Sequence, residues 1–247
     1  MARLYERLAA DNPDMIIHVL DNGSPHSRSR FVTHQNQANS FVGGGIKDCI
    51  RLAEEHNCSY LFFSVNDLQI VRPIRILEFE RILESRPEVV QISASLTVDS
   101  DKIQRYPYML SRPLLRRLRP VPHADLLACM LRLSFIRDFG GFPDSQSGWG
   151  YDREIGYQAR LRQKLVMVSD AAVVRHTEPD AFTPTAVAQR RVKSAEFKRS
   201  YAARYAEQPD WHRFEKHWGL ADRGISFLLS QLRTLRWGPG WDEEPEG

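Results

Sequence analysis

The residues best suited to acid–base and metal chemistry gather in the stretch 140–176. Trp149 precedes two carboxylates, Asp152 and Glu154, and the stretch ends at His176. A helix is expected to begin at Asp152, where free backbone N–H groups and the helix dipole stabilise a carboxylate. An aromatic ring, two carboxylates and an imidazole at the ends of elements are typical of an active site. A lone histidine at a strand end is equally well explained by a structural role.

Further carboxylates and amides directly follow two apolar segments that are expected to be strands. They are Asp21 and Asn22 after the segment 15–20, and Asn66 and Asp67 after the segment 60–65. The carboxyl ends of parallel strands form the crevice in which open α/β sheets bind ligands. Carboxylate oxygens are also the ligands that Mg²⁺ and similar ions prefer. Each of these pairs also fits an ordinary polar turn, and the sequence alone leaves that alternative open.

A glycine-rich segment, residues 43–45, is expected to precede a helix that ends near residue 56. Glycines without side chains permit a close backbone approach and leave N–H groups for a phosphate or ribose. Gly44 and Gly45 are therefore candidates for contacts with a nucleotide. The segment lacks the Gly-Lys-Ser/Thr ending of a phosphate-binding P-loop.

The elements that must position these residues alternate between strands and helices, which predicts an α/β fold. Helices are expected at 2–10, 74–85, from 152 onward and 182–206, and strands at 15–20, 30–34, 60–65, 89–96, 165–168 and 171–174. The partial alternation of residues 89–96 places that strand near a sheet edge. The segment 99–120 carries five arginines and two tyrosines, and is either a loop over the site or a solvated basic loop.

Length and composition narrow the class of protein. The 247 residues are 42% hydrophobic and 26% charged, which indicates a soluble globular domain with a sizeable core. The net charge of +3 suits an anionic ligand and is too small to predict a nucleic-acid partner. Three cysteines without CxxC spacing predict a reducing compartment. A charged start and the lack of a long apolar run predict a cytoplasmic protein.

Residues 148–157, GWGYDREIGY, resemble the Trp-Gly-x-(Glu)-Asp-x-Glu-Leu-Gly-Tyr segment of family 2-type glycosyltransferases of the GT-A fold. The resemblance extends to the Asp-Asn-Gly-Ser turn at 21–24, the glycine segment in 39–53 and the Lys-His-Trp-Gly run at 216–219. The chain departs from the family by having Tyr151 before Asp152, and a single acid in Asn66-Asp67-Leu68 where the family has its DxD-like motif.

This resemblance implies a Rossmann-like GT-A domain with a mixed, mainly parallel sheet flanked by helices. It also implies transfer of a sugar, with inversion, from a nucleoside-diphosphate sugar to a hydroxyl of a glycan or lipid-linked acceptor, in cell-surface glycan or polysaccharide synthesis. The implied roles are Asp152 as catalytic base; Asp21, Asn22, Gly44, Gly45 and Asn66 for the nucleotide; Trp149, Gly150 and Glu154 for the substrate; and Asp67 and His176 for Mn²⁺ or Mg²⁺. A non-catalytic sugar-nucleotide or glycan-binding relative is the alternative, favoured by the single acid at Asp67.

The family comparison also predicts the domain organisation. Residues 1–219 are expected to form the glycosyltransferase domain, with the family's first strand missing at the start of the chain. Residues 220–247 are expected to form a basic amphipathic helix and a disordered tail. Such a helix fits the inner surface of a membrane, its own domain or a second copy of the chain.

Overall fold

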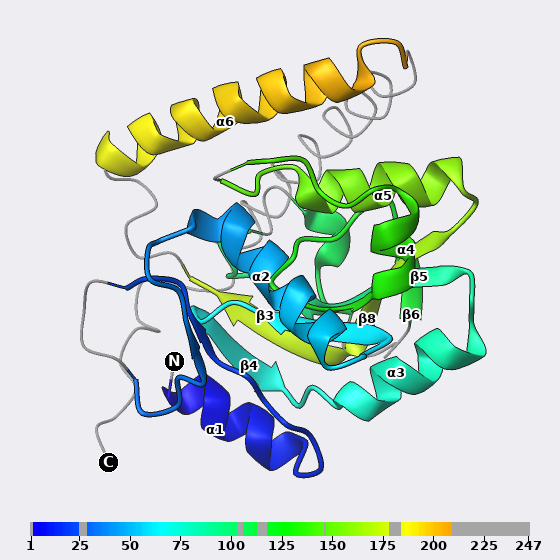
Figure 1. Ribbon diagram of the computed structural model, residues 1–247. Helices are drawn as coiled ribbons and strands as arrows, with labels where there is room; N and C mark the ends of the chain where they lie inside the picture. Colours follow the sequence, from blue (N-terminus) through cyan, green and yellow to red (C-terminus); the bar gives the residue numbers. More distant parts are fainter. Residues whose placement is uncertain are drawn as a thin grey trace.

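The computed structural model describes residues 2–24, 29–102, 106–112, 118–145, 147–177 and 184–208. A six-stranded sheet forms the centre of the molecule (Figure 1). Five strands lie in the order β3 (Tyr60–Ser64), β7 (Ala128–Arg132), β5 (Val89–Leu96), β8 (Leu165–His176) and β4 (Leu68–Arg72). The sixth, β6 (Leu118–Val121), also pairs with β8.

The strand directions in this sheet are mixed. β5 and β8 are parallel, whereas β7 runs against both of its neighbours, and β4 and β6 both run against β8. A separate pair, β1 (Leu20–Asp21) and β2 (His34–Gln35), is parallel. The mixed α/β fold with flanking helices is confirmed, and antiparallel pairs outnumber the parallel pair in the six-stranded sheet because β7 and β8 each run against two neighbours.

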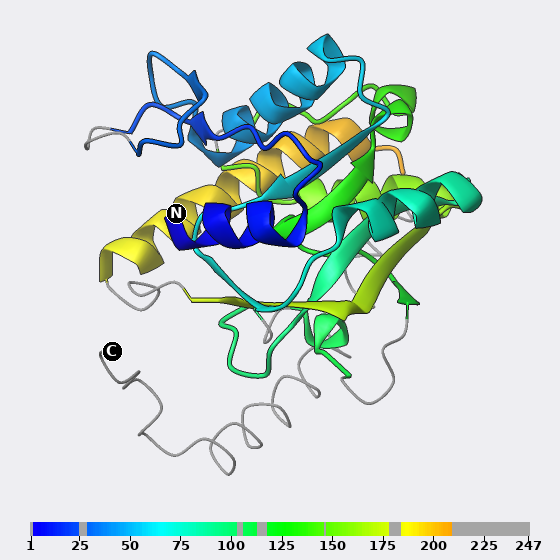
Figure 2. The same cartoon turned by 90° about the horizontal axis from the view of Figure 1, so that it is seen from below.

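Helices enclose the sheet. They are α1 (Ala2–Asp11), α2 (Phe41–Glu55), α3 (Ile76–Ser85), α4 (Leu133–Asp138), α5 (Tyr151–Leu161) and α6 (Pro184–Tyr205), with a 3₁₀ turn at Pro107–Met109. In Figure 1, α1 and α3 lie below the sheet, and α5 and α6 lie above it. Seen from below, α1 lies in front of the sheet and α6 behind it (Figure 2).

The interior strand β5 differs from its expected edge position. It lies between β7 and β8, and all eight of its residues are buried. Its polar side chains find partners inside the core: Gln91 donates to Ser93 at 2.9 Å and to the Ala124 carbonyl at 3.0 Å, and Ser95 donates to the Ala172 carbonyl at 3.2 Å. These bonds pair the Gln91 amide N–H groups and the Ser95 hydroxyl, while Gln91 Oε1 is buried without a partner among the described residues. Because the polar side chains are buried, the polar–apolar alternation does not mark a solvated face.

Several predicted boundaries were also wrong. The strand expected at residues 15–20 is reduced to Leu20–Asp21, and the strand expected at 30–34 to His34–Gln35. The two strands expected at 165–168 and 171–174 are one strand, β8, whose pairing with β5 shifts register between Ala94 and Ser95. The strands β4 and β6 were not predicted.

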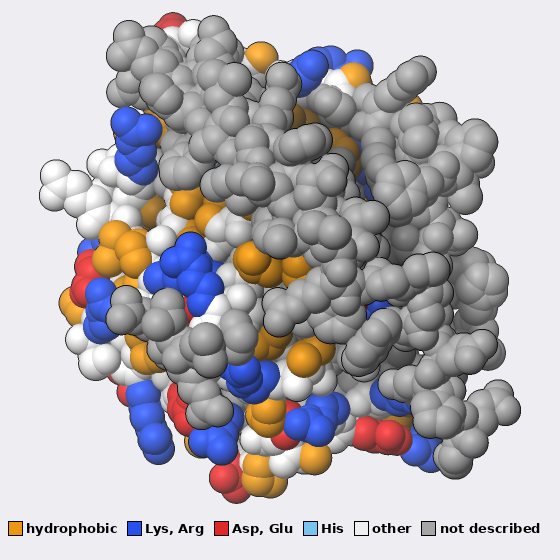
Figure 3. Space-filling view, turned by 180° about the vertical axis from the view of Figure 1, so that it is seen from behind, with side chains coloured by type: hydrophobic (Ala, Val, Ile, Leu, Met, Phe, Trp, Pro, Cys, Tyr) orange, Lys and Arg blue, Asp and Glu red, His pale blue; other side chains and the backbone are white. Residues whose placement is uncertain are grey.

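Part of the predicted C-terminal organisation lies outside the described residues. This concerns the run at 216–219 and the helix and tail expected at 220–247. No helix in the described part of the chain is long and apolar enough to cross a membrane. On the face opposite to that of Figure 1, the visible Lys and Arg side chains are interspersed with acidic and hydrophobic ones (Figure 3).

Candidate functional site

Asp152 lies in the first turn of α5, as the sequence predicted, although the helix begins one residue earlier at Tyr151. The turn before it depends on Gly150, whose φ of 90° is in the left-handed region. The Asp152 side chain is 7% exposed and accepts a hydrogen bond of 2.9 Å from the Tyr106 hydroxyl. His123 Nε2 lies 3.6 Å from the same carboxylate oxygen. The carboxylate is thus held in a fixed orientation.

The groups that hold Asp152 are a phenol and a neutral imidazole. Burial lowers the pKa of His123 to about 4, against the opposing effect of Asp152. Burial, followed by the charges of Asp125 and Asp152, raises the pKa of Tyr106 well above its usual value. Tyr106 therefore keeps its proton and remains a hydrogen-bond donor. Gly156 brings α5 to this cluster, because a Cβ there would lie 2.3 Å from the Pro122 carbonyl oxygen.

Asp67 and His176 come together from the ends of different strands. Asp67 follows β3 and His176 is the last residue of β8, and its Nε2 lies 3.1 Å from Asp67 Oδ2. Asp101 Oδ1 lies 2.6 Å from the other ring nitrogen, Nδ1. Burial opposes a charge on His176, but the hydrogen bonds to Asp101 and Asp67 outweigh that effect and raise its pKa to about 9. The half-exposed Asp67 and the buried His176 thus meet at one point of the surface.

Asp125 connects the two groups electrostatically. Burial first, and then the charge of Asp152, raise the pKa of Asp125 to about 6, while Lys102 and His176 act in the opposite direction. Asp125 lies two residues after His123, in the connection between β6 and β7. The charges of Asp152 and His176 thus act on the pKa of Asp125 in opposite directions.

Asp21 and Asn22 lie at the end of β1 but use their side chains internally. Asp21 Oδ1 accepts a 2.8 Å hydrogen bond from the Ser24 N–H. Asn22 Oδ1 accepts from Asn36 at 2.9 Å and from the Ser40 hydroxyl at 2.5 Å. Asn22 also donates to the Phe41 carbonyl at 2.6 Å. Asn22 therefore fastens β1 to the start of α2.

The expected glycine loop is helical. Residues 43–45 lie inside α2 rather than before it. A Cβ on Gly43 would lie 1.8 Å from the Ser145 carbonyl oxygen, and one on Gly45 would lie 3.1 Å from Asn22 Nδ2. Two of these glycines thus permit close packing of α2 against the loop before α5 and against Asn22.

Trp149, Gly150 and Glu154 lie against α6. Trp149 packs on the buried aromatic cluster of Tyr157, Phe197, Tyr201 and Tyr205. A Cβ on Gly150 would lie 2.1 Å from the Phe197 ring. Glu154 is fully buried, its Oε1 accepts hydrogen bonds from Tyr205 and from Gln158, and burial raises its pKa. The packing of α6 therefore involves three residues that were expected to meet a substrate.

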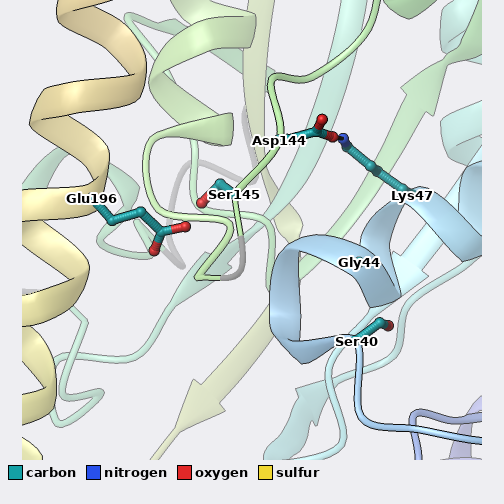
Figure 4. A pocket seen from close by; sticks show the side chains of 6 residues that line it. All are labelled: Ser40, Gly44, Lys47, Asp144, Ser145 and Glu196. Atoms are coloured by element: carbon teal, nitrogen blue, oxygen red, sulfur yellow. Dashed lines mark hydrogen bonds and ion pairs between the residues drawn. The ribbon is translucent and has the colours of Figure 1, made fainter.

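A surface cavity of about 330 Å³ lies beside this packing, between α2, the loop at 144–145 and α6 (Figure 4). Its lining consists of Ser40, Gly44, Lys47, Asp144, Ser145 and Glu196. Lys47 spans its rim to Asp144, with 2.5 Å between Nζ and Oδ1. Gly44 is the only predicted site residue among these six. Asp67, Asp152 and His176 do not line the cavity, so it forms at most the α2 side of a larger site.

Sequence reasoning missed four supporting residues, Asp101, Tyr106, His123 and Asp125. Asp101 had a usable signal, since Asp99-Ser100-Asp101 closely follows the strand 89–96, as Asp67 follows its own strand. His123 and Asp125 come just before an apolar segment. Tyr106 lies in the segment 99–120, and its contact with Asp152 agrees with the alternative of a loop over the site, although the sequence did not single out this tyrosine.

No known family model matches this chain. No curated protein matches it by sequence. One solved structure that it resembles is that of GalNAc-T7 with UDP, GalNAc and Mn²⁺, at 10% sequence identity and a TM-score of 0.43. That match covers 83% of this chain and 46% of the other, so the chain spans about half the length of that protein.

Proposed function

We propose that this protein is a glycosyltransferase that moves a sugar from a nucleoside-diphosphate sugar to an acceptor hydroxyl. The observation that carries the proposal is the pairing of two sites. Asp67, directly before β4, meets His176 at the end of β8, and Asp152 is held at the start of α5. Asp152 raises and His176 lowers the pKa of Asp125, which burial raises most. A carboxylate–imidazole pair that could hold a cation, together with a fixed carboxylate, supplies what phosphate departure and hydroxyl activation require.

Asp67 and His176 would hold a Mn²⁺ or Mg²⁺ ion. The donor set fits if the ion displaces the proton that the raised pKa of His176 retains at neutral pH, because a half-exposed carboxylate and an imidazole nitrogen converge at 3.1 Å. Asp101 binds the remaining ring nitrogen of His176, which is how a second carboxylate usually orients a metal-binding imidazole. When bound, such an ion neutralises charge on a leaving diphosphate. Two protein ligands leave room for phosphate oxygens and water.

Asp152 would act as the general base. Its carboxylate takes the proton from the acceptor hydroxyl as the hydroxyl oxygen forms a bond to the anomeric carbon. The bond between that carbon and the diphosphate breaks, and the nucleoside diphosphate leaves with the bonding electrons. An attack from the face opposite to the leaving group inverts the anomeric configuration. Tyr106 and His123 position the base and touch no reacting atom.

The nucleotide-binding roles of the β1–α2 region remain part of the proposal. Asp21 and Asn22 would contact the nucleotide with Asn66, while Gly44 lines the 330 Å³ cavity. Gly45 packs on Asn22 and would act by keeping it in place. The acceptor class, glycan or lipid-linked, is proposed from the sequence resemblance, with a place in cell-surface glycan or polysaccharide synthesis at the cytoplasmic face of a membrane.

The substrate-binding roles need revision in one respect. Trp149 is partly buried and keeps a role as a stacking surface for a sugar. Gly150 serves the turn before Asp152. Glu154 is buried beneath α6, so we propose that it anchors α6 in place of binding acceptor hydroxyls.

Replacing Asp152 with Asn tests the proposed base. The amide keeps the shape and the acceptor atom for Tyr106 but cannot take a proton at neutral pH. Transfer of sugar from a panel of radiolabelled nucleotide sugars should fall by roughly 10²–10⁴-fold. Nucleotide affinity should change little. Asp138→Asn, at an exposed position ending α4, is the matched control and should retain full activity. Unchanged turnover in Asp152→Asn would remove this residue from the chemistry.

Nucleotide binding with and without Mn²⁺ tests the donor site independently of turnover. Thermal stability measured against several nucleoside diphosphates should rise with one of them, and rise further with MnCl₂. A ligand present at 100 times its Kd adds about 2.7 kcal/mol to the free energy of unfolding. The variants Asp67→Asn and His176→Ala should lose the additional rise in thermal stability that MnCl₂ gives. A rise in thermal stability without sugar transfer would favour the non-catalytic sugar-nucleotide-binding alternative. No rise with any nucleoside diphosphate would contradict both the transferase and this alternative.

A further inference from the structure

Three histidines outside the proposed active site meet on the surface of the molecule. They are His18, His34 and His56, and one nitrogen from each lies within 4.8 Å of the others. The ring centroid of His18 lies 4.9 Å from that of His34 and 5.0 Å from that of His56. His18 and His56 are exposed and His34 is half-buried, so the cluster is open to solvent.

The three imidazoles come from three separate segments with defined backbones. His18 precedes β1, His34 opens β2, and His56 is the C-cap of α2. The His34 and Thr33 N–H groups both bond to the Val19 carbonyl, at 3.1 and 3.0 Å, which fixes the spacing between the first two segments. The His56 N–H bonds to the Leu52 carbonyl at 3.1 Å. The meeting of the rings therefore follows from the fold.

Their environment suits a cation. Thr33 Oγ1 lies 3.0 Å from His34 Nδ1, which leaves Nε2 of that ring for another partner. The carbonyl end of a helix carries partial negative charge, and His56 places its ring at that end of α2. Imidazole nitrogens bind Zn²⁺ at about 2.0–2.1 Å in a tetrahedron, so ligand atoms lie roughly 3.3 Å apart. Binding would draw the three nitrogens, which lie within 4.8 Å of one another, to that spacing.

We propose that His18, His34 and His56 form a binding site for a divalent transition-metal ion such as Zn²⁺, with a water in the fourth position. Late first-row ions prefer imidazole, whereas Mn²⁺ and Mg²⁺ prefer oxygen ligands. The bound ion would join the β1–β2 pair to the C-terminal end of α2. Asn22 already joins that pair to the other end of α2 through Ser40 and Phe41. With the ion bound, the β1–β2 pair would be attached to both ends of α2.

Competition of ZnCl₂ against a chromophoric chelator, with metal analysis after dialysis, measures the site in the full chain. Wild type should bind one Zn²⁺ tightly, and His18→Ala and His56→Ala should each weaken that site at least tenfold. Both positions are exposed, so the variants should fold, which far-UV circular dichroism checks. His176→Ala is the matched control and should keep the tight site. MnCl₂ should compete poorly.

Several outcomes would overturn the proposal. They are no tight Zn²⁺ binding by wild type, equal binding by His18→Ala and His56→Ala, or Mn²⁺ binding as tight as Zn²⁺. Cys58 is exposed two residues after His56, so Cys58→Ser must also keep the site; its loss would contradict a three-imidazole site. Hydrogen exchange gives a second measurement, because ZnCl₂ should slow exchange at the Thr33 and His34 N–H groups in wild type only. None of these measurements depends on transferase activity.

Discussion

Contacts between residues that are far apart in the sequence hold the side chains of the candidate site, and local sequence patterns do not predict such contacts. The position of Asp152 at a helix start could be predicted, because a carboxylate before an apolar helical stripe is a local pattern. Its support by Tyr106 could not be predicted, since these residues are 46 positions apart. Glu154 shows the same limit. Its motif marked it as important, but its burial and its bond to Tyr205 depend on where α6 packs.

Gly150 offers a test of the turn that presents Asp152. Its φ is 90°, and a Cβ would lie 2.1 Å from the Phe197 ring. Gly150→Ala should therefore lower the free energy of unfolding through both backbone strain and displacement of α6. Strain alone costs about 1–2 kcal/mol, and overpacking typically adds about 1–3 kcal/mol. Urea unfolding followed by circular dichroism measures the sum.

Gly140 is the matched control for this test. Its φ is 82°, but a Cβ there would meet no atom within 4 Å. Gly140→Ala should thus show the strain cost without the packing cost, and the difference between the two variants isolates the contact with α6. Equal losses in the two variants would show that α6 does not pack on this turn.

At the scale of elements, local pattern predicted helices better than strands. The ends of α1, α3 and α6 agree with expectation to within two residues, because apolar spacing and prolines mark them. The strands β4 and β6 were missed, since each is short, partly exposed and rich in arginine or proline. Both strands form by pairing with β8, which lies far from them in the sequence. A local sequence pattern does not contain that pairing.

The buried carboxylate of Glu154 contributes polar contacts to the attachment of α6 to α5, beside the aromatic packing. Tyr205 donates to Glu154 Oε1, Gln158 donates to the same oxygen at 3.1 Å, and the Arg204 Nε lies 3.5 Å away. Tyr205→Phe keeps the ring, which packs on Tyr157 at 5.1 Å, and removes only the hydroxyl. The buried carboxylate then loses a donor, at a cost of about 1–3 kcal/mol. Hydrogen exchange across α6 should accelerate accordingly.

A double-mutant cycle sharpens this prediction. Glu154→Gln removes the charge that needs the donor, so the loss caused by Tyr205→Phe should be smaller in that background. Val192→Ala, at a position of α6 that is 67% exposed, is the control for helix propensity. If Tyr205→Phe left exchange in α6 unchanged, Glu154 would not be the anchor of this helix.

At the scale of the whole molecule, the α/β class followed from the alternation of apolar segments, but the strand order did not. Local patterns do not reveal that β7 inserts between β3 and β5, because that choice depends on how buried faces are covered. The same topology draws on separate connections for Asp67, Asp101 and Asp125, and on the end of β8 for His176. Asp67 and His176 were predicted from their places near strand ends, whereas Asp101 and Asp125 were missed.

This gathering of carboxylates predicts how the stability of the molecule depends on pH. The pKa of Asp125 is raised to about 6, mainly by burial and then by Asp152, so the folded state holds its proton more tightly than the unfolded state. Its favourable contribution is complete below its ordinary value near 4 and is lost as the pH rises through about 6. Above pH 6 the folded state therefore contains a destabilised charge.

Asp125→Asn removes that charge at similar volume. The variant should match wild type at pH 4 and exceed it in free energy of unfolding above pH 6, by on the order of 2 kcal/mol. Urea unfolding between pH 4 and pH 8 checks this, with Asp14→Asn, at an exposed position, as the control that should follow wild type throughout. Parallel curves for wild type and Asp125→Asn would contradict the raised pKa. A gain in stability together with a loss of sugar transfer would indicate that the protein retains this charge for its function, since active sites commonly trade stability for activity.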